Sequence, residues 1–394
     1  MAPIQRFVPT LLLAVVAGCH DLNLAPTIGD PTPTPAFTAS APASCAATAA
    51  FTVSDDAELR AALAAASPGD VIAVNGMIGI TMDDTIATDR VTLTCATPGS
   101  GLFTVDSGVV GDLVTVVAQD VTIDGLVLDA TGAFDAAIFA FNDGLTAFAE
   151  GNRFTNNTIT CGPLSICIFV AGGPRSLIAN NQLTAFGAIS GFHLQAGSGA
   201  TFLPSVDGTQ IQGNVIVAAT PSGSPSFGGI RVRDGTGVIV SGNSVLGPWT
   251  NSIAPTHLAA SRFAFNQLQG ARFFGIRMST GPGGALLMID DVFQNNVVTS
   301  EGLAGVFATF ACRNAFVWNS LQGNGGGIGI LFGVTTGANV FVGSQTTIVN
   351  NGAFDCNGDG VNDPNIITGT VRHGTMPPDT VSGAVKTIHG ITLQ

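Results

Sequence analysis

Four basic side chains in the middle of the chain stand two or four residues after a glycine. They belong to the segments Gly191-Phe-His-Leu-Gln, Gly229-Ile-Arg-Val-Arg and Gly275-Ile-Arg-Met-Ser. Because side chains alternate between the two faces of a β-strand, an inward hydrophobic residue after each glycine turns the next residue outward. The basic residues expected on this outer face are His193, Arg231, Arg233 and Arg277.

An arginine-rich face is suited to carboxylates, because the guanidinium fork matches a carboxylate in a bidentate manner. Lys and Arg together number only 13, so three arginines on one face are a concentration. This chemistry favours an acidic saccharide as ligand, and Arg231 or Arg233 is also a candidate base for a polysaccharide lyase. The alternative is structural, with Asp234 or Asp207 pairing with the arginines in a solvated ladder of charges.

Asp290 and Asp291 are a pair of adjacent carboxylates in the later part of the chain. Glycosidases use two carboxyl groups, one as acid and one as base or nucleophile, so the pair is a candidate catalytic site. Asp290 also falls about one repeat before Arg313. A structural salt bridge between these two residues therefore explains the acidic residue equally well.

The segment from Asp355 to Asp363 resembles a calcium-binding loop. It places oxygen-bearing side chains at positions 1, 3, 5 and 9 and a glycine at position 6, but position 12 is Ile366 rather than a bidentate glutamate. A partial, structural calcium site or an ordinary Asx-rich turn fits this pattern. The candidate ligands are Asp355, Asn357, Asp359 and Asp363.

These residues lie in a chain that repeats. An asparagine recurs every 23 to 33 residues at the end of a short apolar segment. Each repeat contains strands too short to bury an apolar face alone, so equivalent strands must stack on one another. Asparagine tolerates the left-handed backbone of a sharp corner, and stacked asparagines can hydrogen-bond along the axis. The recurring residues are Asn157, Asn181, Asn214, Asn243, Asn266, Asn296, Asn319 and Asn351.

The first end of such a stack needs a cap, because an exposed strand edge invites pairing with another chain. Residues 54–67 supply it: Asp55 and Glu58 have the spacing of a capping box, an apolar face follows, and Pro68-Gly69 stops the helix. Val71-Ile-Ala-Val74 follows as the first strand.

The whole pattern resembles the right-handed parallel β-helix family, which includes pectate lyases, polygalacturonases and phage tailspikes. The segment from Ala57 to Ile72 is especially similar to the start of that fold, and the resemblance covers roughly residues 46–350. It implies an all-β solenoid with a short N-terminal capping helix. It does not assign an activity, since one fold hosts many functions. The Gly-His-Gly and Arg-Ile-Lys motifs of polygalacturonases are missing, and an all-β propeller or sandwich is the alternative fold.

The N-terminus resembles a bacterial lipoprotein signal. Arg6 precedes an apolar stretch that is too short to span a bilayer, and Val16-Ala-Gly-Cys19 matches a lipobox. Residues 1–18 are therefore expected to be a signal peptide and Cys19 the lipidated residue. Residues 19–45, rich in Pro, Thr and Ala, are expected to be a tether, with the β-helix at 46–350 and a C-terminal segment at 351–394.

Six further cysteines remain, an even number that suggests disulfides in an exported chain. Fifteen pairings are possible, and the preferred set joins neighbours along the chain. A metal site at these cysteines is not expected, since no Cys-x-x-Cys spacing occurs. The preferred pairs are Cys161–Cys167, Cys312–Cys356 and Cys45–Cys95.

Composition limits the functions to consider. The net charge of −13, with no basic cluster large enough to offset it, argues against nucleic-acid binding. The preferred hypothesis is a non-catalytic protein of the cell envelope, lipid-anchored at Cys19, that binds a glycan or matrix through a β-helix face. A lyase or hydrolase acting on an acidic polysaccharide is the second hypothesis, and a structural spacer the third. No cofactor is expected beyond structural calcium, and the membrane is expected to be contacted only through the lipid.

Overall fold

The computed structural model describes a chain that divides into two units, Thr38–Ala384 and the combination of Met1–Phe37 with Val385–Gln394. The described part of the second unit is an antiparallel pair, β41 (Thr387–Ile388) and β42 (Ile391–Thr392). The described residues are 45–46, 48–105, 110–133, 135–142, 146–162, 165–185, 189–192, 205–218, 228–279, 288–299, 301–325, 328–332, 336–342, 346–349, 353–356, 359–368, 371–373, 387–388 and 391–392.

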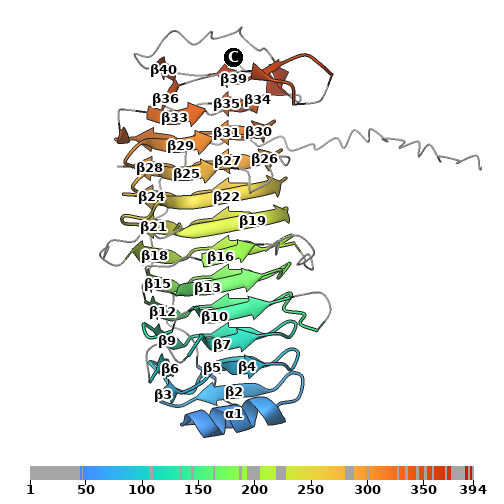
Figure 1. The fold of residues 1–394 in the computed structure, drawn as a ribbon, viewed down its shortest axis with the longest axis vertical. Coiled ribbons are helices and arrows are strands. Elements are labelled where there is room, and N and C mark those ends of the chain that lie inside the picture. Colours follow the sequence, from blue (N-terminus) through green and yellow to red (C-terminus); the bar gives the residue numbers. More distant parts are fainter. Residues whose placement is uncertain are drawn as a thin grey trace, which may run out of the picture. The chain divides into compact units, whose positions relative to one another are not determined.

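In the larger unit the chain coils through three parallel sheets, called here A, B and C, and each turn stacks on the one before (Figure 1). Sheet A contains β1 (Phe51–Val53), β2 (Val71–Val74), β5 (Thr92–Cys95), β8 (Thr122–Asp124), β11 (Arg153–Thr155), β14 (Leu177–Ala179), β17 (Gln210–Gln212), β20 (Ile239–Ser241), β23 (Arg262–Ala264), β27 (Val292–Gln294), β31 (Ala315–Val317), β35 (Val340–Val342) and β39 (Ile366–Thr368). Sheet B contains β3 (Met77–Ile80), β6 (Gly101–Thr104), β9 (Val127–Ala130), β12 (Thr158–Cys161), β15 (Gln182–Ala185), β18 (Val215–Ala218), β21 (Ser244–Leu246), β24 (Gln267–Gln269), β28 (Val297–Thr299) and β32 (Ser320–Gln322).

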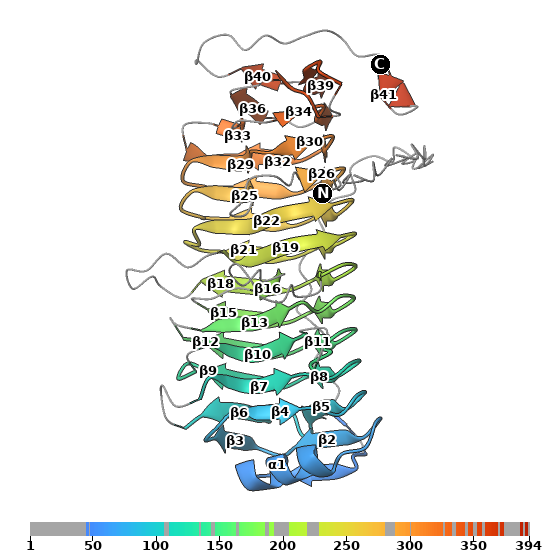
Figure 2. The same ribbon diagram turned by 45° about the vertical axis from the view of Figure 1, so that its right-hand side comes forward.

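Sheet C carries the longest strands and a short side branch. Its main path contains β4 (Asp84–Ile86), β7 (Asp112–Val116), β10 (Ala136–Phe141), β13 (Ile166–Ala171), β16 (Ile189–Phe192), β19 (Ile230–Thr236), β22 (Asn251–Ala259), β25 (Phe274–Met278), β29 (Ala304–Ala308), β33 (Ile328–Phe332), β36 (Thr346–Val349) and β40 (Val371–His373). The branch contains β26 (Met288–Ile289), β30 (Ala311–Cys312) and β34 (Thr336–Gly337). The three sheets pack around one core (Figure 2).

Stacking gives each inward residue the same kind of neighbour above and below. In sheet A four phenylalanines lie fully inside, and their rings stack with centroids 4.7 to 4.9 Å apart, close to the spacing of adjacent strands. They are Phe263, Phe293, Phe316 and Phe341. The predicted all-β fold, a right-handed parallel β-helix, is therefore confirmed.

Helix α1 (Asp56–Ala65) caps the first turn of the solenoid (Figure 1). Asp55 is its N-cap and accepts a hydrogen bond from the backbone N–H of Glu58 at 2.8 Å. The Glu58 carboxylate reaches back to the backbone N–H of Ser54, one residue before the cap, so both ends of the capping box are formed. Leu59 and Leu63 are buried against the first strands, so the predicted cap is confirmed.

The asparagine ladder is present between sheets A and B. Each member after the first accepts hydrogen bonds at Oδ1 from the backbone N–H and the amide of the asparagine one turn earlier, and its own Nδ2 donates to a backbone carbonyl. The first member, Asn157, accepts from the Leu126 backbone N–H. The described run is Asn157, Asn181, Asn214, Asn243, Asn266, Asn296 and Asn319. Asn351, the eighth expected member, lies outside the described residues.

One detail of the ladder prediction is wrong. The left-handed backbone does not belong to the ladder asparagine but to the residue before it, for example Asn180 (φ 57°), Phe265 (φ 58°) and Trp318 (φ 50°). The two tasks are separated because the ladder side chain must point into the wall, where its hydrogen bonds are buried. The preceding residue makes the corner.

A second ladder, which the sequence did not reveal, runs along the turn that leads into sheet A. The backbone N–H of each residue donates to the side-chain oxygen of the residue one turn later, at 2.8 to 3.0 Å. Its members are Ser261, Asp291, Asn314, Asn339 and Asn365. They are chemically varied, so no single residue type marked the repeat.

The three predicted disulfides are confirmed: Cys45–Cys95, Cys161–Cys167 and Cys312–Cys356. Disulfides persist in oxidising compartments, so the chain is an exported protein. The predicted signal peptide, Cys19 and the tether up to Cys45 lie outside the described residues.

The stacked strands continue past residue 350, the predicted end of the β-helix. β39 pairs in parallel with β35 and β40 with β36, which extends the solenoid to His373. The short antiparallel pair β37 (Ala353–Phe354) and β38 (Asp363–Pro364) flanks the acidic loop. The second ladder reaches this turn through Asn365, which explains why the first ladder alone misplaced the boundary. In the described part of the chain, no helix has the length and hydrophobicity to cross a membrane.

Candidate functional site

The outer face of sheet C carries the predicted arginines. In β19, Ile230 and Val232 are fully buried in the core. Arg231, which lies between them, and Arg233, which follows Val232, therefore point outward. In β25, Ile276 and Met278 are buried, and Arg277 between them is exposed. The prediction that these three arginines share one face is consistent with this alternation.

The predicted register between these arginines is wrong by one turn. β22 lies between β19 and β25: Arg231 pairs with Ala254, and Ile253 pairs with Ile276. Arg231 and Arg277 are therefore two turns apart, about 10 Å along the axis, with the small Ala254 between them. β22 begins with Asn251 and has no glycine marker, which is why the sequence comparison passed over it.

One other register assignment also changes. Ile189 pairs with Ile230, which brings Phe192 opposite Arg233 instead of opposite Ile230. His193 lies outside the described residues.

The arginines influence one another electrostatically. Partial burial lowers the pKa of the Arg231 guanidinium, and the positive charges of Arg233 and Arg277 lower it further. The Arg277 side chain makes no ion pair or hydrogen bond with any described residue, although its backbone belongs to sheet C. In a chain of net charge −13, this part of sheet C is a local concentration of positive charge.

Asp234 joins one of these arginines to His257 of β22. Arg233 Nε lies 3.0 Å from Asp234 Oδ2, an ion-pair contact without good hydrogen-bond alignment, and His257 Nδ1 lies 2.9 Å from Asp234 Oδ1. The side chains of Arg233, Asp234 and His257 are 12%, 18% and 9% exposed. The predicted Asp234–arginine pairing therefore exists for Arg233.

Backbone geometry brings the histidine and the aspartate together. Asp234 and His257 both have left-handed φ, 58° and 50°, at matching positions of the adjacent strands β19 and β22. Arg233 pairs with Thr256, so the residues that follow each of them meet side by side. The sequence signal for this pair is only visible once the register is known, because 23 residues separate the partners.

Aromatic side chains border the arginines. Phe274 and Phe307 stack with ring centroids 4.9 Å apart, and Phe307 pairs directly with Arg277 across the strands. Phe273 is 44% exposed beside them. Aromatic faces of this kind contact the apolar faces of sugar rings. Trp249, in contrast, is fully buried and donates to the Leu246 carbonyl, so it packs into the solenoid.

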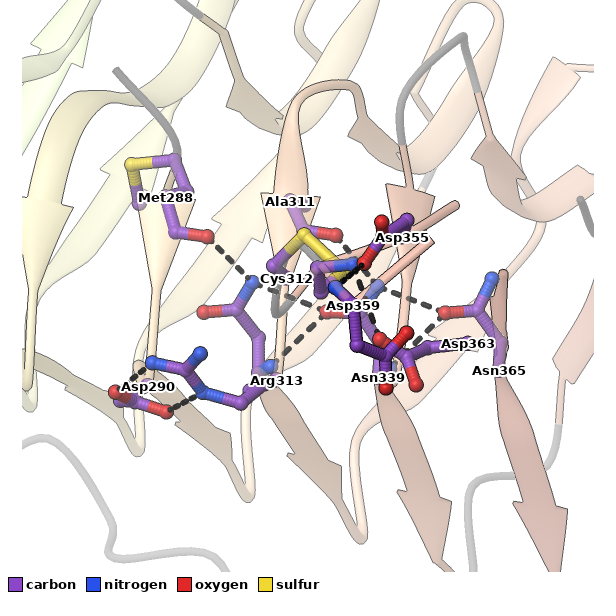
Figure 3. The surroundings of a disulfide bond; sticks show 12 residues. Met288, Asp290, Ala311, Cys312, Arg313, Asn339, Asp355, Asp359, Asp363 and Asn365 are labelled. Carbon is purple, nitrogen blue, oxygen red and sulfur yellow. Dashed lines mark hydrogen bonds and ion pairs between the residues drawn. A yellow bond between two sulfur atoms is a disulfide. The ribbon is translucent and has the colours of Figure 1, made fainter. Parts of the chain in front are cut away.

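The paired aspartates do not form a joint site. Asp290 is about half exposed and makes a two-pronged ion pair with Arg313, with both contacts at 2.8 Å (Figure 3). Asp291 is fully buried in the second ladder, where Oδ1 accepts from the Ser261 backbone N–H. One carboxylate is therefore exposed in an ion pair and the other is buried in a ladder, and catalysis by the pair stays a prediction.

The acidic loop of the last turns adjoins the Cys312–Cys356 disulfide (Figure 3). Asp355 accepts hydrogen bonds from the backbone N–H groups of Asp359 and Gly360, and Asp363 accepts from that of Cys356. Asn357 lies outside the described residues. Among the residues described, no three His, Cys, Asp or Glu side chains converge as metal ligands. Calcium binding here stays a prediction.

Comparisons with known proteins give similarities to solved structures alone. No family model and no curated protein matches the chain. An alginate lyase from Paenibacillus sp. str. FPU-7 has a TM-score of 0.42 and 15% identity, over 82% of this chain and 99% of that one. A GH136 lacto-N-biosidase from Eubacterium ramulus has a TM-score of 0.49 and 11% identity, over 82% and 67%. A PL6 family polysaccharide lyase from Pseudopedobacter saltans has a TM-score of 0.43 and 13% identity, over 86% and 97%.

Proposed function

We propose that this exported protein is anchored by a lipid at Cys19 and binds an acidic polysaccharide along the outer face of sheet C. The observation that supports this most directly is the positive cluster of Arg231, Arg233 and Arg277 on one face of an otherwise acidic chain. Like charges held together on a surface are stabilised by an anion placed between them.

The arrangement favours a polymer over a single small anion. Arg231 and Arg277 lie on turns about 10 Å apart along the axis, so a chain that runs parallel to the axis meets both. Arg277 is exposed and available for a bidentate contact with a carboxylate. The stacked Phe274–Phe307 pair beside it offers an apolar surface to the neighbouring sugar.

Anchoring at Cys19 is tested separately from binding. Metabolic labelling with a radioactive fatty acid is expected to label the wild-type protein, which should fractionate with membranes. Cys19→Ala should lose both properties while the β-helix itself stays folded. Label that persists in this variant would contradict lipidation at Cys19.

Arg277→Ala is expected to weaken the binding of a polyuronate about tenfold or more. Loss of one charge-assisted contact costs about 1.5 to 3 kcal/mol, and about 1.4 kcal/mol corresponds to a factor of ten. Isothermal titration calorimetry with defined oligomers of several uronates measures the change. Affinity should also fall as salt is raised, because the contacts are ionic.

The matched control is Arg153→Ala, which removes one exposed positive charge from β11 in sheet A. Its affinity for the oligomers should equal that of the wild type. Equal losses in both variants would mean that net charge, rather than the face of sheet C, determines binding. Absence of binding to any polyuronate would overturn the proposed function.

A further inference from the structure

We propose a second ligand site on the outer corner between sheets A and B, where Phe265 and Trp318 bind a flat, neutral, β-1,4-linked polysaccharide. This corner carries none of the arginines of sheet C, so the inference goes beyond the proposed function and does not depend on it. It concerns binding and includes no reaction.

The backbone of this corner is the first argument. From Gly125 to Trp318, each turn passes from sheet A to sheet B through one residue with left-handed φ, between 50° and 71°. In all but the last of these residues the backbone N–H donates to a carbonyl of the next turn. Six of the eight are glycine or asparagine, the types that tolerate this conformation best. The corner row consists of Gly125, Asn156, Asn180, Gly213, Gly242, Phe265, Asn295 and Trp318.

Phe265 and Trp318 are the two exceptions in the corner row. The Phe265 N–H donates to the Gln294 carbonyl just as the Gly242 N–H donates to the Ala264 carbonyl, so both positions require the same backbone conformation. A bulky side chain strains that conformation. Burial does not explain the choice, because Phe265 is 41% exposed and Trp318 is only partly buried. Backbone strain that packing does not offset is concentrated at functional sites.

The surroundings of these two residues determine the charge of the ligand. The strands that leave the corner on these turns, β21, β24, β28 and β32, contain no charged residue. Of the strands that enter it, β20, β23, β27 and β31, only β23 contains one, Arg262, which donates to Gln294 Oε1 at 3.2 Å. The amides of Gln269 and Gln322 are exposed beside the corner. In a chain of net charge −13, an uncharged strip with amides complements a neutral ligand that has hydroxyl groups.

The spacing along the axis determines the shape of the ligand. Phe265 and Trp318 lie two turns apart, about 10 Å, with Asn295 on the turn between them. In an extended β-1,4-linked chain each sugar is turned over relative to the next, so the same face recurs at every second sugar, after about the same length. A chain that lies along the corner therefore presents like faces to both rings. Aromatic rings contact the apolar faces of sugars, and the Asn295 amide can bind hydroxyl groups of the sugar between them.

Cellulose and chitin share this chemistry, since both are neutral β-1,4-linked chains that differ by an acetamido group. An α-1,4-linked glucose chain coils and does not repeat one face along a straight line. Soluble hexasaccharides of the three kinds, cellohexaose, chitohexaose and maltohexaose, therefore test the proposal and distinguish the two sources.

Tryptophan fluorescence of the full-length protein measures the binding directly. The chain has two tryptophans, and Trp249 is fully buried, so a surface ligand reaches Trp318. We expect a saturable change in emission with cellohexaose, with chitohexaose or with both, and none with maltohexaose. No change with either β-1,4-linked sugar, or an equal change with maltohexaose, would overturn the inference.

Phe265→Asn gives the corner the residue that Asn295 supplies on the next turn. Its affinity for the hexasaccharide should fall about tenfold or more, as on truncation of an aromatic residue central to a binding site. Its urea midpoint should equal or exceed that of the wild type, because asparagine relieves the backbone strain. The matched control is Phe148→Asn, which removes a phenylalanine that is 42% exposed on the turn between β10 and β11 and should leave the affinity unchanged.

Three outcomes with these variants contradict the proposal: wild-type affinity in Phe265→Asn, an equal loss in Phe148→Asn, or a clearly lower midpoint in Phe265→Asn, which would show that the ring is kept for packing. Trp318→Asn removes the fluorescent reporter and is tested by sedimentation with insoluble cellulose or chitin, where it should lose the binding that the wild type shows. Retained sedimentation would overturn the role of Trp318.

The new site and the proposed function can fail separately. Arg277→Ala should keep the affinity for the neutral hexasaccharide, and Phe265→Asn should keep the affinity for the polyuronate. A polyuronate should not displace the hexasaccharide from Trp318. Displacement, or loss of both affinities in either variant, would place both ligands on one surface and overturn the inference of a second site.

Discussion

Asn243→Ala is expected to lower the free energy of unfolding by about 4 kcal/mol. The asparagine side chain makes four buried hydrogen bonds: Oδ1 accepts from the backbone N–H and the amide of Asn214, and Nδ2 donates to the Ile211 carbonyl and to Asn266 Oδ1. Alanine leaves these partner groups inside the wall without their bonds. Each buried polar group left unpaired costs about 1 to 3 kcal/mol, partly offset by local relaxation.

The shift is measured as the change in the urea midpoint of unfolding, followed by circular dichroism. A solenoid can unfold in stages, so variants are compared with the same probe and conditions. Gln269→Ala is the control, since Gln269 lies at the end of β24, the strand that follows Asn266, and its side chain is exposed. Its midpoint should move by no more than the equivalent of about 0.5 kcal/mol. An equally small shift for Asn243→Ala would mean that the ladder contributes little to stability.

The ladder was predictable from the sequence because one chemical requirement recurs on every turn. An amide must accept from one turn and donate to the next, and asparagine is the short side chain that does both. The cap was predictable for a similar reason, since Asp55 and Glu58 satisfy local backbone groups within one segment. Requirements that are local or repeated leave a visible pattern.

Register between turns was harder to predict. Loops of different length separate the strands, so spacing along the chain does not state which residues lie side by side. β22 was missed because it lacks the glycine that marks the neighbouring strands, and this misplaced Arg231 relative to Arg277 by one turn. A single unmarked turn is enough to change which side chains meet.

The His257–Asp234 pair was invisible for the same reason. The partners are far apart in sequence, and their contact depends on two left-handed residues at matching positions of adjacent strands. Left-handed backbone at a histidine is not a pattern that composition or alternation reveals. The arginines could be found by counting, whereas the His257–Asp234 contact beside them required the three-dimensional register.

Asp291→Asn is expected to stabilise the protein at pH 8 by about 3 kcal/mol. Asp291 occupies a place in the second ladder that Asn314 and Asn339 fill on the next two turns. Their Nδ2 atoms each donate two hydrogen bonds, for example from Asn339 to the Ala311 carbonyl and to Asn365 Oδ1. In Asp291 the second side-chain atom, Oδ2, is buried and has no hydrogen-bond partner. An amide at this place can donate where the carboxylate cannot.

The effect should depend on pH. The pKa of Asp291 is raised to about 7, mainly by burial. The hydrogen bonds with Ser261 lower this pKa, and the negative charge of Asp290 adds to the increase. The folded state therefore holds its proton more tightly than the unfolded state, so the stability contribution is complete below about pH 4 and is lost as pH rises toward 7. The full loss for such a shift is about 4 kcal/mol at most.

Urea midpoints of wild type and Asp291→Asn, compared at pH 4.5 and pH 8, measure this dependence. The asparagine variant lacks the titrating group. Its free energy of unfolding should therefore exceed that of the wild type by no more than about 1 kcal/mol at pH 4.5, and by more at pH 8. The buried acids Asp84, Asp112 and Glu301, whose pKa values burial also raises, are present in both proteins and cancel in the comparison. The reciprocal change, Asn243→Asp, should produce the opposite dependence, since it places an unpaired carboxylate in the first ladder. If Asp291→Asn stabilised the protein equally at both pH values, the cost of burying a charge would not contribute. Hydrogen bonding alone would then explain why the other turns carry asparagine.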